Sequence, residues 1–273
     1  GFKLILLSLV PRKMPVTSSV VVPAYKEVGN LRPLCERIFA ACKQAGIDKT
    51  TEVVVVDDNS CDGSVEVVNE LKKEGYNVRI IVRTKERGLS SAVLRGFDDA
   101  KGDVMLCMDA DLQHPPEKVP ELIEALKEGA EFVIGTRYAP GVAIDKDWPM
   151  HRQIISKGAR LLARPLTPLT DPMTGFFGIR SEVYSQAVKE KNISPIGFKI
   201  CMELYVKSQI KSYKEVPFSF GLRTAGESKL SGKVIVYYLL HLKDLYFFSM
   251  PLFLPILFLI VLFVLYLIFT QLL

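Results

Sequence analysis

Two carboxylates two residues apart, Asp109 and Asp111, are the side chains of this sequence best placed to do chemistry. They directly follow the apolar run 104–108, which is typical of a buried strand. Oxygen ligands at this spacing can reach one hard cation, and Gln113 adds an amide oxygen two residues further on. Mg²⁺ and Mn²⁺ both suit such a set, and either ion could neutralise the charge that develops on a departing diphosphate.

A second group of residues has the chemistry of a phosphate clamp. Arg137 follows another apolar run, and Arg152 lies four residues before Ser156. If residues 151–163 form a helix, Arg152 and Ser156 share one of its faces. Two guanidinium groups and a hydroxyl bind phosphate well, although surface salt bridges are an alternative role for the arginines. The polar, basic segment 223–231 could close over a diphosphate as a lid or act as a plain linker.

Asp57 and Asp58 directly follow a further expected strand, 52–56, which ends in four valines. An acidic residue at such a strand end often accepts hydrogen bonds from a ribose or a base edge. The alternative is a turn or helix cap for segment 59–64, which is rich in turn-forming residues, and each aspartate could take one of the two roles. The chain has no G-x-G-x-x-G, G-x-x-x-x-G-K-[ST] or G-x-S-x-G pattern, which counts against the dinucleotide-binding, P-loop and α/β-hydrolase classes.

Alternating strands and helices must position these clusters. The expected strands are 19–22, 52–56, 78–82, 104–108 and 132–134, several of them valine and isoleucine runs suited to a sheet buried on both faces. Helices are expected between them and, further along, near 151–163, 180–190 and 198–208. This order predicts an α/β, Rossmann-like domain with a mostly parallel sheet over residues 17–232. Because ligands bind beyond the carboxyl ends of such strands, the polar clusters are expected to meet in one crevice.

The two ends of the chain differ in composition from this domain. Residues 251–270 carry no charge, which predicts a transmembrane helix over 251–273, and the aromatic-rich segment 233–250 is expected to be an interfacial amphipathic segment. Lysines precede the span and no Lys or Arg follows it, so the domain is expected in the cytosol. Residues 1–16 are interpreted as an N-terminal extension, with Met14 as the working start.

The composition of the 273 residues narrows the class of protein further. With 49% hydrophobic and 24% charged residues the chain is not disordered, and a net charge of +5 favours anionic partners. Nucleic acid is not expected as a partner, because the basic residues are neither clustered on one helix nor interleaved with aromatic ones. The five cysteines are odd in number and form no C-x-x-C pair, which indicates a reducing compartment and buried thiols.

Seven segments, in order along the chain from about Ser18 onward, resemble the family 2 glycosyltransferases with a GT-A fold. They are VVPAYKEVGNL (21–31), VVVDDNSCDGS (54–64), RGLSSAVLRGF (87–97), MDADLQHPPE (108–117), GTRYAP (135–140), DPMTGFFGIR (171–180) and RTAGESKLSG (223–232). The resemblance implies transfer of mannose from GDP-mannose to dolichol phosphate, with inversion at the anomeric carbon. It also implies a metal, Mg²⁺ or Mn²⁺, and a place in the endoplasmic reticulum membrane, with a single C-terminal anchor in the lipid bilayer and the catalytic domain facing the cytosol.

The resemblance implies roles for individual residues wherever the motif matches. Guanosine is expected to contact Pro23, Tyr25, Glu27, Val56 and Asp58, and the diphosphate to contact Arg223 and Lys229. The metal is expected to bind Asp109, Asp111 and Gln113, with Ala110 against the nucleotide. The acceptor phosphate is expected to be clamped by Arg137, Arg152 and Ser156, which with Asp111 are the expected catalytic residues. Lys26 stands where many relatives have Asn, at a position with no proposed ligand contact.

Such a reaction needs no general base. A phosphate monoester has a second pKa of about 6, so the acceptor is largely dianionic at cytosolic pH and is already a nucleophile. Two other interpretations use the same residues: transfer from UDP-glucose to the same lipid phosphate, and a non-catalytic, membrane-tethered subunit that binds nucleotide. Regulatory partner subunits are compatible with the sequence, but the expected built-in anchor suggests that they are not required.

Overall fold

The computed structural model describes residues 14–139, 150–191, 193–195, 199–219, 232–252, 255–256, 258–263 and 270, without the side chains of 150–154 and 232–235. Its centre is a seven-stranded sheet in the order β3-β2-β1-β4-β6-β5-β7. Neighbouring strands are parallel except around β6, which is antiparallel to both β4 and β5. The strands are β1 (Ser18–Ala24), β2 (Thr51–Asp57), β3 (Val78–Val82), β4 (Val104–Cys107), β5 (Phe132–Thr136), β6 (Phe177–Arg180) and β7 (Tyr213–Pro217).

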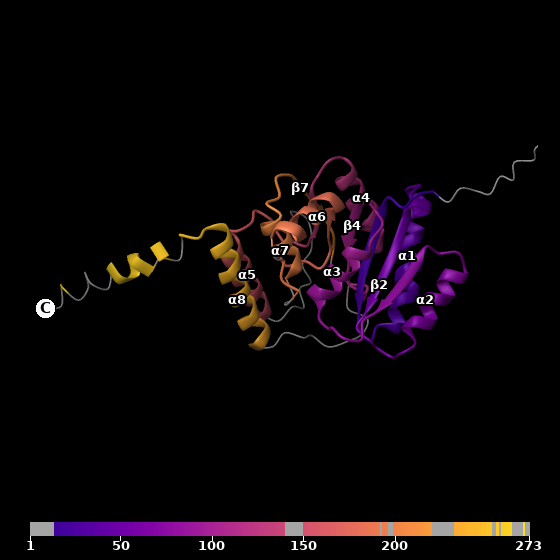
Figure 1. Ribbon diagram of the computed structural model, residues 1–273, viewed down its shortest axis with the longest axis horizontal. Coiled ribbons are helices and arrows are strands. Elements are labelled where there is room, and N and C mark those ends of the chain that lie inside the picture. Colours follow the sequence, from indigo (N-terminus) through magenta and orange to yellow (C-terminus); the bar gives the residue numbers. More distant parts are fainter. Residues whose placement is uncertain are drawn as a thin grey trace, which may run out of the picture.

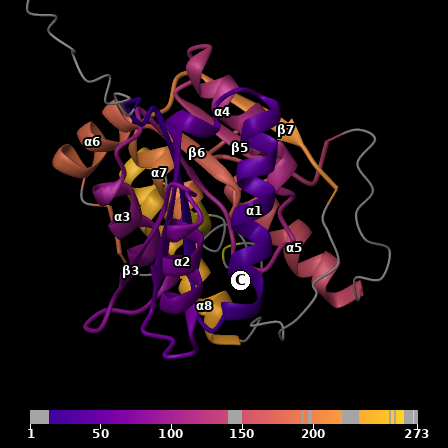
Figure 2. The same cartoon turned by 90° about the vertical axis from the view of Figure 1, so that its right-hand side faces the viewer.

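Helices cover both faces of this sheet (Figures 1 and 2). One face packs against α1 (Val28–Gln44), α2 (Ser64–Lys73) and α4 (Val119–Lys127). The other packs against α3 (Leu89–Asp99), α6 (Ser181–Glu190) and α7 (Ile200–Lys207). Short 3₁₀ turns, Asp48–Thr50 and Pro116–Lys118, precede β2 and α4. With both faces covered, a strand such as β2 can be buried at every residue, and its centre is a run of four valines.

The α/β fold with a mostly parallel sheet is as predicted from the sequence, and the five expected strands are all present. The helices expected near 151–163, 180–190 and 198–208 are α5 (Met150–Ala163), α6 and α7. Strands β6 and β7 were not predicted. Only Val216 of β7 is buried, so no apolar run marks it, and it is a strand because β5 pairs with it along its whole length.

The segment expected to lie at the membrane interface, 233–250, folds as α8 (Gly232–Ser249) and runs beside α5 and α7 (Figure 1). The Tyr238 hydroxyl donates to the carbonyl of Ala159 at 2.6 Å, and the Tyr246 hydroxyl donates to that of Leu162 at 2.8 Å. Large apolar side chains of α8, among them Val236, are about half exposed. Leu242 and Leu245 are buried in the same core cluster as Tyr238. The helix therefore packs on the domain along one face and presents apolar surface on the other.

Among the described residues, no helix combines the length and the apolarity needed to cross a membrane. The span predicted over 251–273 lies only partly within the described residues, and residues 1–13 of the predicted N-terminal extension lie outside them. Residues 14–17 lead into β1, where the N–H of Thr17 donates to the carbonyl of Thr50 at 2.8 Å.

Candidate active site

A cavity of about 430 Å³ opens at the carboxyl ends of β1, β2 and β4. Its walls come from segments 23–27, 87–92 and 109–111 and from Asp58. Strand ends of a doubly wound sheet are the expected place for a ligand, because the loops that follow them diverge there. The cavity brings together seven residues expected to bind donor or metal: Pro23, Tyr25, Glu27, Asp58, Asp109, Ala110 and Asp111.

The turn after β4 carries the two aspartates of this cavity. The side chain of Asp109 is 39% exposed, whereas Asp111 is only 7% exposed. Leu112 adopts a left-handed conformation with φ of 61°, which is uncommon for a residue other than glycine. In the tight turn that results, the N–H of Gln113 donates to Oδ1 of Asp111 at 3.2 Å. The three expected metal ligands are thus gathered in one turn, with the more exposed carboxylate first.

His114 lies behind this turn and is 3% exposed. Its ring stacks on Phe176 with 5.2 Å between centroids, and its Nδ1 accepts the N–H of Asp109 at 3.2 Å. Burial lowers the pKa of His114 more than the neighbouring charges of Asp109 and Asp111 raise it, so the ring is neutral at neutral pH. A neutral ring that accepts at Nδ1 carries its proton on Nε2. His114 therefore supports Asp109 from the core side.

Gly175 packs directly against the Asp109 carboxylate. A Cβ at this position would lie 2.7 Å from each carboxylate oxygen of Asp109. No side chain can therefore replace the hydrogen of Gly175 unless the Asp109 carboxylate moves.

The two aspartates at the end of β2 take different roles. Asp58 lies in the wall of the main cavity, where its carboxylate accepts hydrogen bonds from Arg83 and from the N–H of Gly88. Asp57 instead holds the following turn, because its carboxylate accepts the N–H of Ser60 at 2.9 Å and the Ser60 hydroxyl. The sequence allowed one aspartate for a ligand and one for the turn; the turn role belongs to Asp57, and Asp58 is the one that lines the cavity.

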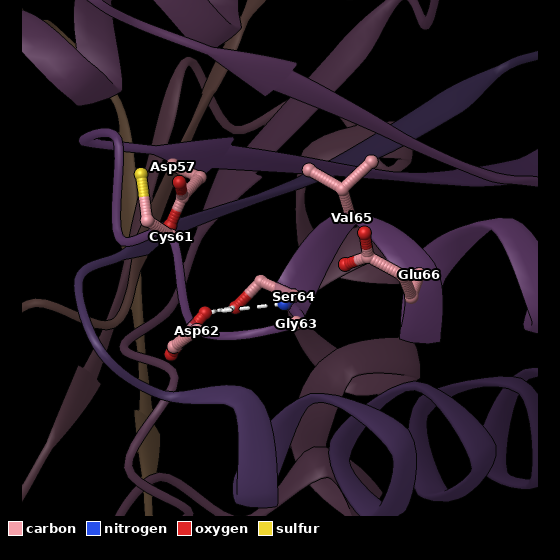
Figure 3. Close-up of a pocket in the computed structure, with 7 residues that line it drawn as sticks. All are labelled: Asp57, Cys61, Asp62, Gly63, Ser64, Val65 and Glu66. Carbon is pink, nitrogen blue, oxygen red and sulfur yellow. Dashed lines mark hydrogen bonds between the residues drawn. The ribbon is translucent and has the colours of Figure 1, made fainter.

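Figure 3 shows a second, smaller cavity of about 290 Å³ at the start of α2. Asp62 accepts the N–H of Ser64 at 3.1 Å and its hydroxyl at 2.6 Å (Figure 3), and it also accepts the N–H of Val28 at 3.3 Å. Burial alone would raise the pKa of Asp62, but these hydrogen bonds outweigh it and hold the pKa below its usual value. Asp62 therefore accepts the first N–H of both α2 and α1 and ties the starts of the two helices together.

Cys61, next to Asp62, corrects the expectation of five buried thiols. Its φ of 52° places it in a left-handed turn, and the residue is exposed. The other four cysteines are buried and free, as expected. The sequence pattern missed the difference because the turn that follows β2 sets the direction of the side chain.

On the expected acceptor side, Arg137 is held by a buried carboxylate. Its Nε and Nη2 donate to the two oxygens of Asp171 at 2.7 and 3.0 Å, and Asp171 is 0% exposed. Burial opposes the charge of Arg137, but Asp171 outweighs it and keeps the pKa of the guanidinium above its usual value. The pair therefore presents a fixed cation near Asp109, whose charge also stabilises the guanidinium.

Tyr138 links this cation to Ser156. The Tyr138 hydroxyl and the Ser156 hydroxyl are 2.9 Å apart, within hydrogen-bonding distance. The guanidinium of Arg160 lies 3.7 Å from the centroid of the Tyr138 ring, and that of Arg137 lies 5.6 Å from it. Two of the three expected phosphate ligands, Arg137 and Ser156, are thus joined through one aromatic residue.

Other expected site residues are not brought to the cavity or cannot be placed. Val56 is fully buried, and its side chain packs against α3 at Gly96, away from the lining of the cavity. Arg152 lies on α5 with Ser156, but its side chain is outside the described residues. Arg223 and Lys229 also lie outside them.

Four residues near these sites had no assigned role in the sequence interpretation: Arg83, Tyr138, Asp171 and Lys199. Tyr138 and Asp171 fall inside segments that carried the family resemblance, GTRYAP and DPMTGFFGIR, so their position was a signal. Lys199 precedes α7, and its pKa is lowered by burial and by the charge of Arg137, while Asp171 and Asp109 oppose this. No local pattern marked Arg83 or Lys199.

Comparisons with known proteins bear on the family and the fold. Residues 19–187 match the family model of glycosyl transferase family 2. The dolichol-phosphate mannosyltransferase of Saccharomyces cerevisiae is 57% identical over 86% of this chain and 89% of its own, and that of Mycosarcoma maydis is 58% identical over 84% and 79%. A crystal structure of glucosyl-3-phosphoglycerate synthase from Mycobacterium tuberculosis with Mn²⁺, UDP-glucose and phosphoglyceric acid superposes with a TM-score of 0.59 over 84% of this chain and 80% of that one. At 18% identity, this last likeness shows the GT-A fold alone.

Proposed function

The chain belongs to glycosyl transferase family 2, and from this premise we propose that it is an enzyme that transfers mannose to dolichol phosphate. The observation that carries the proposal is identity of 57 and 58% with two dolichol-phosphate mannosyltransferases over most of their length. The carboxylates and cations of the site suit this reaction, because it joins a phosphate acceptor to a donor that leaves as a polyanion.

We further propose that the donor is GDP-mannose and that it occupies the main cavity. A volume of about 430 Å³ falls in the range of small-molecule sites. Tyr25 offers an aromatic face, and the carboxylates of Glu27 and Asp58 offer acceptors for the N–H groups of a guanine base. The other two interpretations, a UDP-glucose donor and a non-catalytic subunit, are not favoured by relatives named for mannose transfer.

A divalent cation, Mg²⁺ or Mn²⁺, fits the turn 109–113. The donor set consists of oxygen atoms only, and the Asp109 carboxylate lines the main cavity and is partly exposed. Asp109, Asp111 and Gln113 would hold the ion, which when bound would offset negative charge on the diphosphate. This set has only two carboxylates, with an amide as its third ligand. The described residues contain no group of three or more His, Cys, Asp and Glu side chains that could hold a metal.

The remaining residues act on the acceptor. The phosphate dianion attacks the anomeric carbon from the face opposite the diphosphate, which inverts that carbon. Arg137, aimed by Asp171, offsets the acceptor's charge, and the hydroxyl of Ser156 donates to it. Arg152, on the same helix as Ser156, is proposed to complete this clamp, and Arg223 and Lys229 are proposed to bind the diphosphate.

A membrane location follows from the proposed acceptor, since a polyprenyl chain stays in the bilayer. We propose that the protein resides at the endoplasmic reticulum membrane with its domain in the cytosol, anchored through 251–273. The apolar surface of α5 and α8 supports a bilayer beside the acceptor site, because Leu161, Tyr237 and Phe247 are all about half exposed or more.

A donor panel tests the function. The full chain in detergent receives dolichol phosphate, MnCl₂ or MgCl₂, and radiolabelled GDP-mannose or UDP-glucose, and organic-phase radioactivity is counted. We expect product from GDP-mannose alone, lost when EDTA removes the metal. Product from UDP-glucose alone would overturn the donor assignment, and absence of product from both would favour the non-catalytic interpretation.

Gly175→Ala tests the placement of Asp109. Because the new Cβ would clash with both Asp109 oxygens, we expect the rate of mannose transfer to fall roughly 10- to 100-fold, as when a metal ligand loses its support. Stability should change little, since the group displaced is the end of a side chain. Steady-state rates and the unfolding midpoint measure the two effects. Gly29→Ala is the control, because its Cβ would meet nothing within 4 Å; wild-type rates in Gly175→Ala would contradict the placement.

A further inference from the structure

A buried guanidinium lies behind one wall of the donor cavity without lining it. Arg83 follows β3, and its side chain is 4% exposed. Its Nε donates to Oδ1 of Asp58 at 2.7 Å, and its Nη1 donates to the hydroxyl of Ser91 at 2.8 Å. Its Nη2 donates to the carbonyl of Gly88 at 3.0 Å and also to Asp58. One side chain therefore joins the end of β2 to the start of α3.

These contacts close a ring through Gly88. While the Gly88 carbonyl accepts from Arg83, the Gly88 N–H donates to Oδ2 of Asp58 at 2.8 Å. Gly88 adopts φ of 124° and ψ of 150°, a backbone conformation that is essentially restricted to glycine. Both polar groups of this residue are thus bound in a geometry that the free chain would seldom adopt. The Arg83–Asp58–Gly88 ring, as we call it, fixes how the chain enters α3.

The residues that this ring holds are the ones that face the cavity. Arg87, Gly88, Leu89 and Ala92 line it together with Asp58 itself. The Arg87 guanidinium lies 5.7 Å from the centroid of the Tyr25 ring, so the two residues face each other at the cavity. Any movement of the Arg83–Asp58–Gly88 ring would therefore change the distance between Arg87 and Tyr25 and the direction of the Asp58 carboxylate.

We propose that Arg83 is a positioning residue for the nucleotide-sugar donor: it holds segment 87–92 and Asp58 in the arrangement that binds the nucleotide. Removing a charge from water is costly, and here the hydrogen-bonded partners of the charge, Asp58, Ser91 and Gly88, all belong to the segments that build the cavity wall. The exposed carboxylate of Glu86 lies further away, at 4.0 Å. Arg83 acts through the wall, so its influence falls on donor affinity and leaves the chemical step unchanged. The inference rests on the proposed function for the identity of the donor.

Arg79, on β3 four residues before Arg83, offers a control. Its Nε donates to Glu52 at 3.1 Å and its Nη2 to the carbonyl of Asp99 at 2.6 Å. It is therefore also a partly buried arginine with several acceptors, but its partners lie at the other end of β2 and of α3, and none of them lines the cavity. If the arginine contacts were merely structural, replacing Arg83 and replacing Arg79 should have similar effects on the protein.

The test compares Arg83→Lys with Arg79→Lys in the full chain. Lysine keeps the charge but cannot reach three acceptors with the planar geometry of arginine. For Arg83→Lys we expect the KM for GDP-mannose and the Kd for GDP to rise about tenfold, the effect of losing one charged hydrogen bond, with kcat within about twofold of wild type. For Arg79→Lys both constants should stay at wild-type values. Calorimetric titration with GDP gives Kd without turnover.

Three outcomes would overturn the inference. One is a folded Arg83→Lys variant with unchanged KM and Kd, another is a fall in kcat alone, and the third is an equal rise in Kd for Arg79→Lys. If Arg83→Lys does not fold, Ser91→Ala removes one contact of Arg83 without leaving a charge unpaired, and it should raise Kd in the same direction. Binding of UDP in place of GDP by the wild type would refute the proposed donor, and the comparison of the arginine variants would then be made with UDP.

Discussion

Asp111→Asn is expected to lower mannose transfer by about a thousandfold while leaving the fold intact. The substitution removes one negative charge from the only pair of carboxylates that the described residues place in the turn after β4. Loss of several kcal/mol of electrostatic stabilisation at a departing diphosphate corresponds to a rate change of this size. The amide keeps the shape of the side chain and can still accept the N–H of Gln113, so the turn should persist.

Transfer rates and Mn²⁺ binding, followed by electron paramagnetic resonance, measure this effect. The metal titration separates a lost ligand from a lost fold, and the unfolding midpoint checks the latter. Asp103→Asn is the control, because Asp103 lies exposed at the opposite end of β4. A well-folded Asp111→Asn variant with substantial transfer would refute the metal role of this carboxylate.

Arg137→Gln is expected to damage both stability and transfer. It leaves Asp171, which is 0% exposed, as a buried carboxylate without its bidentate partner. Breaking a buried pair from one side typically costs about 3–5 kcal/mol of unfolding free energy. Transfer should fall at least about a hundredfold, as when a charge-stabilising donor is removed from an active site.

The double variant Arg137→Gln with Asp171→Asn separates these two effects. Neutralising both partners removes the uncompensated charge, so most of the lost stability should return, as measured by chemical denaturation. Transfer should stay low, because the cation proposed to bind the acceptor phosphate is still absent. Recovery of transfer together with stability would show that the pair is structural and that Arg137 does not bind the acceptor phosphate.

Local sequence patterns predicted most of the parallel half of the fold. Strands such as β2 and β4 are buried on both faces and appear as apolar runs, and each helix between them shows its own periodicity. Beyond residue 140 this signal weakens. Strand β6 is only four residues long and inserts antiparallel between β4 and β5, so its place depends on strands distant in the chain.

The candidate site also has a part that local sequence predicts and a part that it does not. The Asp109–Asp111 turn was predictable from sequence alone, because both residues follow one strand and share one loop. The phosphate clamp, proposed from residue types, stays a prediction. Which charges meet depends on the folded arrangement of distant segments. Arg83 and Asp58 are 25 residues apart in the chain, and Arg137 and Asp171 are 34 apart. No local pattern encodes such pairs, since they form only when the order of strands in the sheet brings two loops to the same edge.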